Sequence, residues 1–211
     1  MLGKVKRAAG ARRPEKGLDY EKSEWFITHM MMTSSRRLST AEERRHTVLR
    51  TAIKAFAARG YYGTTTTEVA KAAGISQAYL YRLFPDKEAL FVAVVDYCSA
   101  RIRECHAEGA AYATTAEPAA VLAAMTAAYT ELIADRDLLM VLLHATCASS
   151  EPAIREAVRA CYAKQVEYVR AASGASDEQI RRFFGDGLLA NVLVGVDAAA
   201  LDARWARTLL G

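Results

Sequence analysis

The chain has 211 residues, of which 52% are hydrophobic and 25% are charged, and its formal net charge is +4. This length suffices for a small domain and a larger one, each with a core. No apolar run reaches the roughly 18 to 20 residues that a membrane-spanning helix needs, because Asn191 and Gly195 interrupt the longest run, residues 188–196. We therefore expect no membrane partner, and the abundance of Ala, Leu, Arg and Glu predicts an all-α protein.

The charge is unevenly distributed along the chain. Residues 1–95 contain 17 Lys and Arg and 9 Asp and Glu, a net +8, whereas residues 96–211 contain 11 and 15, a net −4. A basic first half indicates contact with a polyanion, although ordinary surface variation could produce the same asymmetry. The four cysteines lack the spacing of a disulfide framework, so we interpret them as reduced thiols in a cytoplasmic protein: Cys98, Cys105, Cys147 and Cys161.

Residues 1–38 form a basic N-terminal extension. Its composition favours a flexible or misassigned leader, and any of the methionines at residues 30–32 could be the natural start. The alternative interpretation is a basic arm that contacts phosphates or enters a minor groove.

A helix is expected from Thr40 to Arg59. Thr40 and Glu43 have the spacing of a capping box. Apolar residues then recur every three or four positions, which predicts one buried stripe. Gly60 follows the last turn and is expected to end the helix.

Residues 64–84 predict two short helices joined by a tight turn. Thr65 and Glu68 form a second capping box, and Ser76 can cap the second helix. Gly74 stands where the turn favours a positive φ, and Pro85 stops the second helix. Small and apolar residues occupy the inward positions of both helices. Together these features predict a helix-turn-helix, the unit that places its second helix in a DNA major groove.

The exposed side of the second helix carries groups that can read DNA. Glutamine bonds the adenine edge, alanine and tyrosine contact thymine methyls, and arginine reads guanine or holds phosphate. Threonine, tyrosine and lysine nearby can hold phosphate oxygens. For the tyrosines, packing at the domain edge is the alternative. The predicted DNA-binding residues are Thr65, Gln77, Ala78, Tyr79, Tyr81, Arg82 and Lys87.

This segment resembles the N-terminal signature of the TetR family of bacterial transcriptional regulators. The likeness covers residues 40–95, and it continues beyond the helix-turn-helix through Phe84 and residues 87–91. One departure is Leu83, where the family often has histidine; we expect it to pack inward. The resemblance implies a homodimer with a three-helix DNA-binding domain, residues 39–85, and a six- or seven-helix ligand-binding and dimerisation domain, residues 86–211. It also implies repression that a small-molecule effector releases.

The remainder of the chain predicts further helices. Their expected ranges are residues 86–112, 118–135, 137–148, 152–173, 177–196 and 197–210, the last beginning at Asp197 or Ala198. The final two carry strong apolar faces, which predict a four-helix bundle with a second copy. The alternative is packing within one chain. These faces contain Leu188, Leu189, Val192, Leu193 and Val196, and then Leu201, Trp205, Leu209 and Leu210.

A ligand pocket is only weakly specified by the sequence. Aromatic, apolar and a few polar residues of the second domain could line it, and each could equally be ordinary core: Tyr129, Met140, His144, Cys147, Tyr162, Phe183, Phe184 and Asn191. His144 and Cys147 share a helix face, and Cys105 and His106 could join them, so a metal-responsive regulator is an alternative. We otherwise expect no metal and no cofactor.

The sequence shows no phosphate-binding loop and no catalytic constellation of serine, histidine and carboxylate residues. We therefore predict that the protein is no enzyme but a sequence-specific DNA-binding regulator of a pseudo-palindromic operator. A repressor released by a small molecule is the first hypothesis. An activator or regulator of the same fold without a ligand is the second, and a helical enzyme or scaffold with a helix-turn-helix used only for packing is the third.

Overall fold

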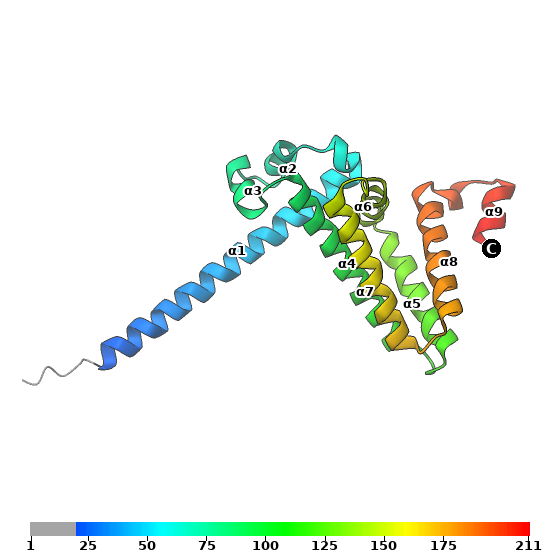
Figure 1. The fold of residues 1–211 in the computed structure, drawn as a ribbon, viewed down its shortest axis with the longest axis horizontal. Coiled ribbons are helices and arrows are strands. Elements are labelled where there is room, and N and C mark those ends of the chain that lie inside the picture. Colours follow the sequence, from blue (N-terminus) through cyan, green and yellow to red (C-terminus); the bar gives the residue numbers. More distant parts are fainter. Residues whose placement is uncertain (1–19) are drawn as a thin grey trace, which may run out of the picture. The chain divides into compact units, whose positions relative to one another are not determined.

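The computed structural model describes the backbone of residues 20–211 and the side chains from residue 42 on. The chain divides into two units between Glu43 and Arg44. In the part of the chain that the structure describes, every regular element is a helix (Figure 1), so the all-α prediction is confirmed. None of the described helices is both long and apolar enough to cross a membrane.

Helix α1, Tyr20–Gly63, begins earlier than expected. Thr40 lies inside the helix, so the predicted start at Thr40 was wrong. Residues 20–39 contain neither proline nor glycine, and nothing in them terminates a helix that continues into the apolar stripe. The predicted break at Gly60 is confirmed, because this residue has φ 67° and ψ −178°. Of the extension predicted at residues 1–38, residues 20–38 belong to α1, and residues 1–19 lie outside the described residues.

Helices α2, Thr66–Ala72, and α3, Gln77–Leu83, form the expected helix-turn-helix. The capping box of Thr65 with Glu68 is present, and the Ser76 hydroxyl accepts a hydrogen bond from the Tyr79 backbone N–H at 3.1 Å. Gly74 has φ 66°, the left-handed conformation that the tight turn requires. Each local signal in the sequence of this motif is therefore realised in the backbone.

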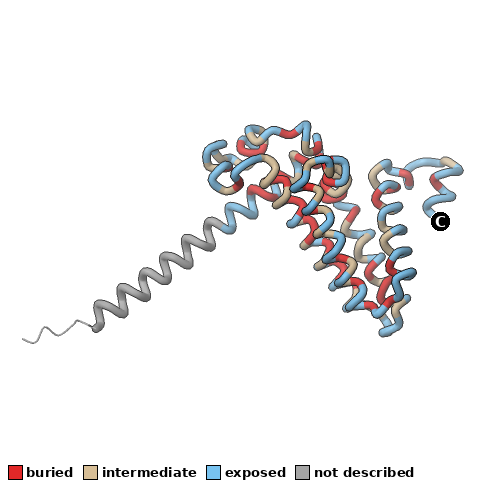
Figure 2. Tube along the Cα trace, viewed as in Figure 1, coloured by how far each residue is buried: buried red, intermediate tan, exposed pale blue. Residues whose placement is uncertain are grey.

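The core of the helix-turn-helix continues into the larger body. Phe56 of α1 meets Phe91 of α4, Lys87–Ala111, with ring centroids 4.7 Å apart, and both are fully buried. The same cluster of buried residues extends to Leu138 and Ile154 on α6, Arg136–Cys147, and α7, Pro152–Ser173. Helix α4 therefore connects the helix-turn-helix to the body by shared packing as well as by the chain. Figure 2 shows the buried residues of these helices in red.

The body is completed by α5, Pro118–Ile133, and α8, Asp177–Gly195. Helix α4 packs closely on α5, because a Cβ on Gly109 would lie 2.8 Å from the Ala124 backbone oxygen. The last expected helix is divided. Asp197 adopts a left-handed conformation with φ 54°, so only a 3-10 turn, Ala198–Ala200, follows before α9, Arg204–Leu210. The prediction of one continuous helix from residue 197 was therefore wrong.

Candidate nucleic-acid interface and internal cavity

Three polar side chains bridge the two helices of the motif. Gln77 Nε2 donates to Thr66 Oγ1 at 3.1 Å and lies 3.4 Å from the Tyr81 hydroxyl, which itself lies 3.0 Å from Thr66 Oγ1. Gln77 and Tyr81 are both exposed. This network fixes the start of α3 and holds the glutamine amide in one orientation on the surface, and it gives Tyr81 a neighbour on α2 that the sequence did not suggest.

Basic side chains surround the exposed face of α3. The guanidinium groups of Arg44 and Arg82 each lie 5.9 Å from the Tyr79 ring centroid. Arg45 stacks 4.3 Å over the Phe84 ring and donates to the Leu83 backbone oxygen at 3.0 Å. The Leu83 side chain packs against the core, as expected for its departure from histidine. Contacts of this kind hold positive charge beside the recognition helix.

Thr65 and Lys87 already have partners within the chain. Thr65 Oγ1 takes part in the α2 capping box, and Lys87 Nζ donates to the Thr64 backbone oxygen at 3.3 Å. The same ammonium lies 4.5 Å from the Tyr61 ring centroid. Lys87 is half-buried and keeps two further N–H bonds for other acceptors, whereas Ala78 and Arg82 are exposed.

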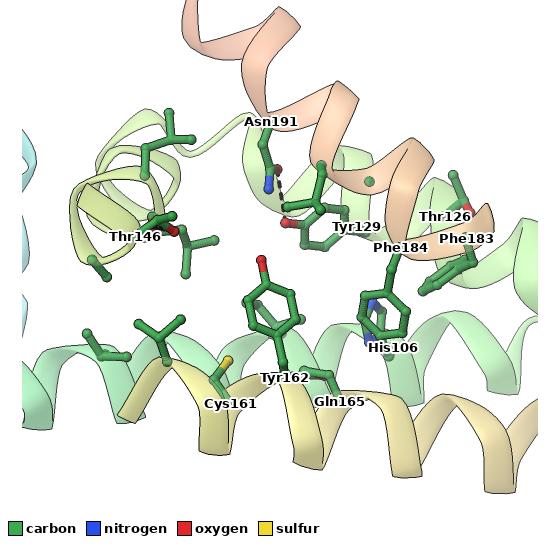
Figure 3. Close-up of a pocket in the computed structure, with 18 residues that line it drawn as sticks. His106, Thr126, Tyr129, Thr146, Cys161, Tyr162, Gln165, Phe183, Phe184 and Asn191 are labelled. Atoms are coloured by element: carbon green, nitrogen blue, oxygen red, sulfur yellow. Dashed lines mark hydrogen bonds between the residues drawn. The ribbon is translucent and has the colours of Figure 1, made fainter. Parts of the chain in front are cut away.

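An internal cavity lies among helices α4, α5, α6, α7 and α8, with a volume of about 110 Å³ (Figure 3). Its lining is mostly aromatic and aliphatic. The polar residues among the lining are His106, Thr126, Tyr129, Thr146, Tyr162, Gln165 and Asn191.

Five of the predicted pocket residues line this cavity: Tyr129, Tyr162, Phe183, Phe184 and Asn191. Met140, His144 and Cys147 do not. Met140 packs against the main core, the His144 ring lies against Gly60, and Cys147 is exposed. Because these three share one face of α6, the cavity is lined by the other face, with Leu142, Leu143, Ala145 and Thr146.

The arrangement of histidines does not favour the metal-responsive alternative. His106 lines the cavity, whereas His144 lies beside Gly60 on the other face of α6. Among the described residues, no group of three or more histidine, cysteine, aspartate or glutamate side chains could hold a metal ion.

Sequence reasoning did not include His106 and Gln165 among the pocket residues. Both are 3% exposed, and one comes from α4 and the other from α7. The sequence places both residues on the inward faces of long helices. A polar residue at such a position does not indicate a cavity beside it. Only the packing of five helices reveals it.

Burial keeps the ionisable groups of the cavity neutral. It lowers the pKa of His106 to about 4, against a smaller opposing effect of the Gln165 side chain. It raises the pKa of Tyr129 to about 12, and the Tyr129 hydroxyl donates to Asn191 Oδ1 at 2.9 Å. At neutral pH the imidazole and the phenol are therefore both uncharged.

Two buried polar atoms, His106 Nδ1 and Gln165 Oε1, make no hydrogen bond of good geometry among the described residues, yet a hydrogen bond with the Gln165 side chain raises the pKa of His106, so the two side chains face each other. The orientation of the Gln165 amide is fixed, since its Nε2 donates to the Ser99 backbone oxygen at 2.9 Å. Its Oε1 is therefore the end that faces His106, and it can only accept. The His106 ring lies between the rings of Tyr129 and Phe183, at centroid distances of 5.8 and 5.5 Å.

The last two helices expose apolar side chains on the surface of one chain. Each of the following is between 39% and 55% exposed: Leu188, Leu189, Val192, Val196, Leu201, Trp205, Leu209 and Leu210. Leu193, which was assigned to the same face, is buried instead and packs with Ala198 and Ala206. An apolar surface of this kind is typical of a protein-protein contact.

Known proteins resemble both parts of the chain. Residues 48–94 match the model of the bacterial regulatory proteins of the tetR family. The transcriptional regulator YuxN of Bacillus subtilis is 39% identical over 56 residues, which are 26% of this chain and 19% of the relative. The matched segments span only 19% to 30% of the curated relatives.

The fold likeness extends much further along the chain. The regulator FadR from Bacillus subtilis, solved with stearoyl-CoA, is 17% identical over 78% of this chain and 95% of its own, with a TM-score of 0.60. AibR, solved with isovaleryl coenzyme A and operator DNA, is 24% identical over 70% of this chain and 85% of its own, with a TM-score of 0.58. A family-specific helix-turn-helix thus continues into a body with the fold of such regulators. Residues 48–94 therefore form a DNA-binding domain of the tetR family of bacterial regulatory proteins, and the rest of the chain shares the fold of such regulators.

Proposed function

We propose that this DNA-binding regulator acts in the cytoplasm as a homodimeric repressor that leaves its operator when a small molecule fills the cavity. The observation that carries the proposal is that two helices serve both sites. Helix α4 begins beside the helix-turn-helix at Lys87 and lines the cavity with Val95, Ile102 and His106. Helix α6 lines the cavity on one face and lies against Gly60 on the other.

This geometry supplies a route between ligand and DNA. The two α3 helices of a dimer would enter successive major grooves about 34 to 36 Å apart. A ligand that fits only one arrangement of α4 and α6 shifts the population toward that arrangement by its differential affinity. A shift of α4 would move Lys87, and a shift of α6 would move His144 against the end of α1. Either change spoils the spacing of the two recognition helices.

The dimer itself is supported by the exposed apolar residues of α8 and α9. Two copies of this surface would bury one another in a four-helix arrangement. The solved relatives with coenzyme A thioesters support a ligand-responsive body, and AibR with operator DNA supports binding of DNA by this fold.

The proposal is tested first by selecting bound fragments from random duplex DNA with the full chain. We expect a pseudo-palindromic consensus, with binding that weakens steeply as salt rises. A folded dimer that selects no sequence would contradict both regulator hypotheses. The hypothesis of a helical enzyme or scaffold would then remain. Release of the selected operator by a small molecule then separates a ligand-released repressor from a regulator without a ligand. Measuring transcription from a promoter that carries the operator, with and without the protein, shows whether the protein represses or activates.

A further inference from the structure

Resting on the proposed ligand-responsive function, we infer that the cavity binds a compact, neutral, largely apolar carbonyl compound, whose oxygen accepts hydrogen bonds from the Asn191 amide N–H and the Tyr162 hydroxyl. Small ketones and esters belong to this class. Alcohols, carboxylates and coenzyme A thioesters do not.

The charge of the lining decides between neutral and ionised ligands. Among the described residues that line the cavity, none is Lys, Arg, Asp or Glu. Burial lowers the pKa of His106 to about 4 and raises the pKa of Tyr129 to about 12, so neither side chain is charged at neutral pH. A carboxylate or phosphate would lose its hydration without gaining a cation, which is strongly unfavourable in an apolar site. The cavity therefore selects an uncharged molecule.

The size of the cavity limits the ligand further. A volume of about 110 Å³ is of the same order as that of an apolar protein cavity of about 150 Å³ known to hold benzene. A single small ring or a short aliphatic chain therefore fits, whereas a coenzyme A moiety does not. The rings of Phe183 and Phe184 meet edge to face at a centroid distance of 5.3 Å and supply an aromatic wall.

Asn191 supplies the first hydrogen-bond donor. Its side chain lines the cavity, is 8% exposed, and accepts from the Tyr129 hydroxyl at Oδ1. That bond fixes the amide, so the other end presents the two N–H bonds of Nδ2. Nδ2 makes no hydrogen bond to a described residue, and it keeps accessible surface, whereas His106 Nδ1 is enclosed. A ligand can therefore reach Nδ2, and the group that pairs with it must be an acceptor.

Tyr162 supplies the second donor from the facing helix. Figure 3 shows its ring extending from α7 into the cavity, with the hydroxyl directed toward Tyr129 and Asn191. Charge on Tyr162 raises the pKa of Tyr129, so the two phenols lie near each other. The Tyr162 hydroxyl has no hydrogen-bond partner among the described residues, and burial raises its pKa, so it keeps its proton at neutral pH. The side chain is 40% exposed, which places it at the border of the cavity, with Asn191 deeper inside.

The hydrogens of the lining select a carbonyl over a hydroxyl group. Thr126 and Thr146 donate to backbone oxygens of their own helices, at 2.9 and 3.2 Å, and Tyr129 donates to Asn191. A carbonyl oxygen has two lone pairs and can accept from Asn191 and Tyr162 together. An alcohol brings a further hydrogen. Whether it accepts from Tyr162 or donates to it, one O–H of that pair has no acceptor among these two side chains and the ligand.

The experiment measures binding of four probes of similar size to the full chain: cyclopentanone, cyclopentanol, methylenecyclopentane and cyclopentanecarboxylate. Partition from the headspace measures the volatile probes, and calorimetry measures the carboxylate. We expect cyclopentanone to bind at least about fivefold more tightly than cyclopentanol, because the alcohol leaves one hydrogen unpaired. It should bind at least about tenfold more tightly than the carboxylate. Equal or tighter binding of cyclopentanol or the carboxylate would overturn the inference, as would a lack of cyclopentanone binding or a preference for isovaleryl-CoA.

Variants locate the carbonyl oxygen. The quantity compared is the ratio of cyclopentanone affinity to methylenecyclopentane affinity, because the difference in hydration between these probes cancels between wild type and variant. Asn191→Leu should lower the ratio at least about tenfold, and Tyr162→Phe at least about threefold. Tyr168→Phe removes a hydroxyl from α7 outside the lining and should keep the wild-type ratio.

The assignment is refuted if the ratio is unchanged in Asn191→Leu and Tyr162→Phe, or if it falls as far in Tyr168→Phe. If Asn191→Leu does not fold, as judged by helicity and a cooperative thermal transition, Tyr162→Phe decides, because it keeps the ring of a half-exposed side chain. An unchanged ratio in Tyr162→Phe then refutes the assignment.

Operator release is measured in parallel and separates the two proposals. Cyclopentanone that binds with the expected preferences without releasing DNA would support the ligand class and contradict ligand-released repression. A different molecule that releases DNA through this cavity, with no binding of cyclopentanone, would support repression and overturn the ligand class.

Discussion

The imidazole of His144 lies directly against Gly60, the residue at which α1 breaks. A Cβ on Gly60 would lie 3.0 Å from His144 Nδ1. The contact joins α6, whose other face lines the cavity, to the end of the first helix of the DNA-binding domain. It therefore has both a structural and a regulatory consequence.

Replacement of Gly60 by alanine should destabilise the protein by about 1 to 3 kcal/mol, measured by urea unfolding. Its φ of 67° with ψ of −178° is a conformation that is almost restricted to glycine, and the added methyl meets His144. Gly174→Ala is the matched control. Gly174 has φ 64° and ψ 15° with no neighbour within 4 Å of the added carbon, so about 1 kcal/mol is expected. Equal losses would contradict the extra cost that we assign to the ψ of −178° and the His144 contact together.

Removal of the Gln77 amide should relax base preference at one position of each operator half-site. Gln77→Ala is expected to lose about tenfold discrimination there, the effect of one bidentate base contact. Thr66→Val, which removes the hydroxyl that orients the amide, should show the same change with a smaller size. Sequence selection with each variant measures it. A uniform loss over all positions would instead assign Gln77 to the backbone.

Lys87→Ala should weaken binding to all sequences similarly and lower the slope of log affinity against log salt by about 1. The reason is the loss of one phosphate contact from an ammonium that Thr64 and Tyr61 hold in place. Lys164→Ala, an exposed position on α7, is the charge-matched control and should leave the slope unchanged. A variant that changed base preference without changing the slope would contradict this role.

A charge in the exposed apolar surface of α8 should separate the proposed dimer. Val192→Glu places a carboxylate at a side chain that is 51% exposed in one chain and would be buried between two. We expect sedimentation at micromolar concentration to give a monomer, and operator affinity to fall at least about tenfold. Ala163→Glu, on an exposed position of α7, should sediment as the wild type does. A Val192→Glu dimer would mean that the copies associate elsewhere.

Protonation of His106 should make stability depend on pH. Its pKa is about 4 in the folded state and about 6.5 in the unfolded chain, so the unfolded state binds more protons between these values. Stability is complete above about pH 6.5 and falls as the pH drops toward 4. The contribution lost between pH 7.5 and pH 5 is about 2 kcal/mol.

His106→Phe should remove this part of the pH dependence. The measurement is the difference between wild type and variant in unfolding free energy at the two pH values, which cancels the carboxylates common to both. An identical pH dependence in the two proteins would contradict a neutral, buried His106.

Much of the fold could be predicted because its signals are local. The Thr65 and Ser76 caps, the positive φ of Gly74 and the break at Gly60 each depend on a few neighbouring residues. The start of α1 was misplaced for the same reason: a capping box at Thr40 is a valid local signal, yet no breaker precedes it, so the helix continues through it. Similarly, no local sequence pattern predicted the left-handed conformation of Asp197, which divides the last expected helix.

The candidate sites divide in the same manner. The face of α3 follows from helical periodicity, so its exposed residues could be named from the sequence. The cavity could not, because it depends on the rotation of α6. That rotation directs Leu142 and Thr146 inward and turns His144 toward Gly60. Both faces of α6 carry apolar residues, so the sequence does not show which face lines the cavity.

The sequence by itself determined the helical class, the helix-turn-helix and the family of the segment that contains it, residues 48–94, since each rests on short-range spacing of small, apolar and capping residues. Only the tertiary structure decided that His106 and Gln165, 59 positions apart in the sequence, end beside each other at one cavity. The physical reason is that a cavity is space that five packed helices leave unfilled. Its position depends on all their relative rotations, which no local pattern encodes.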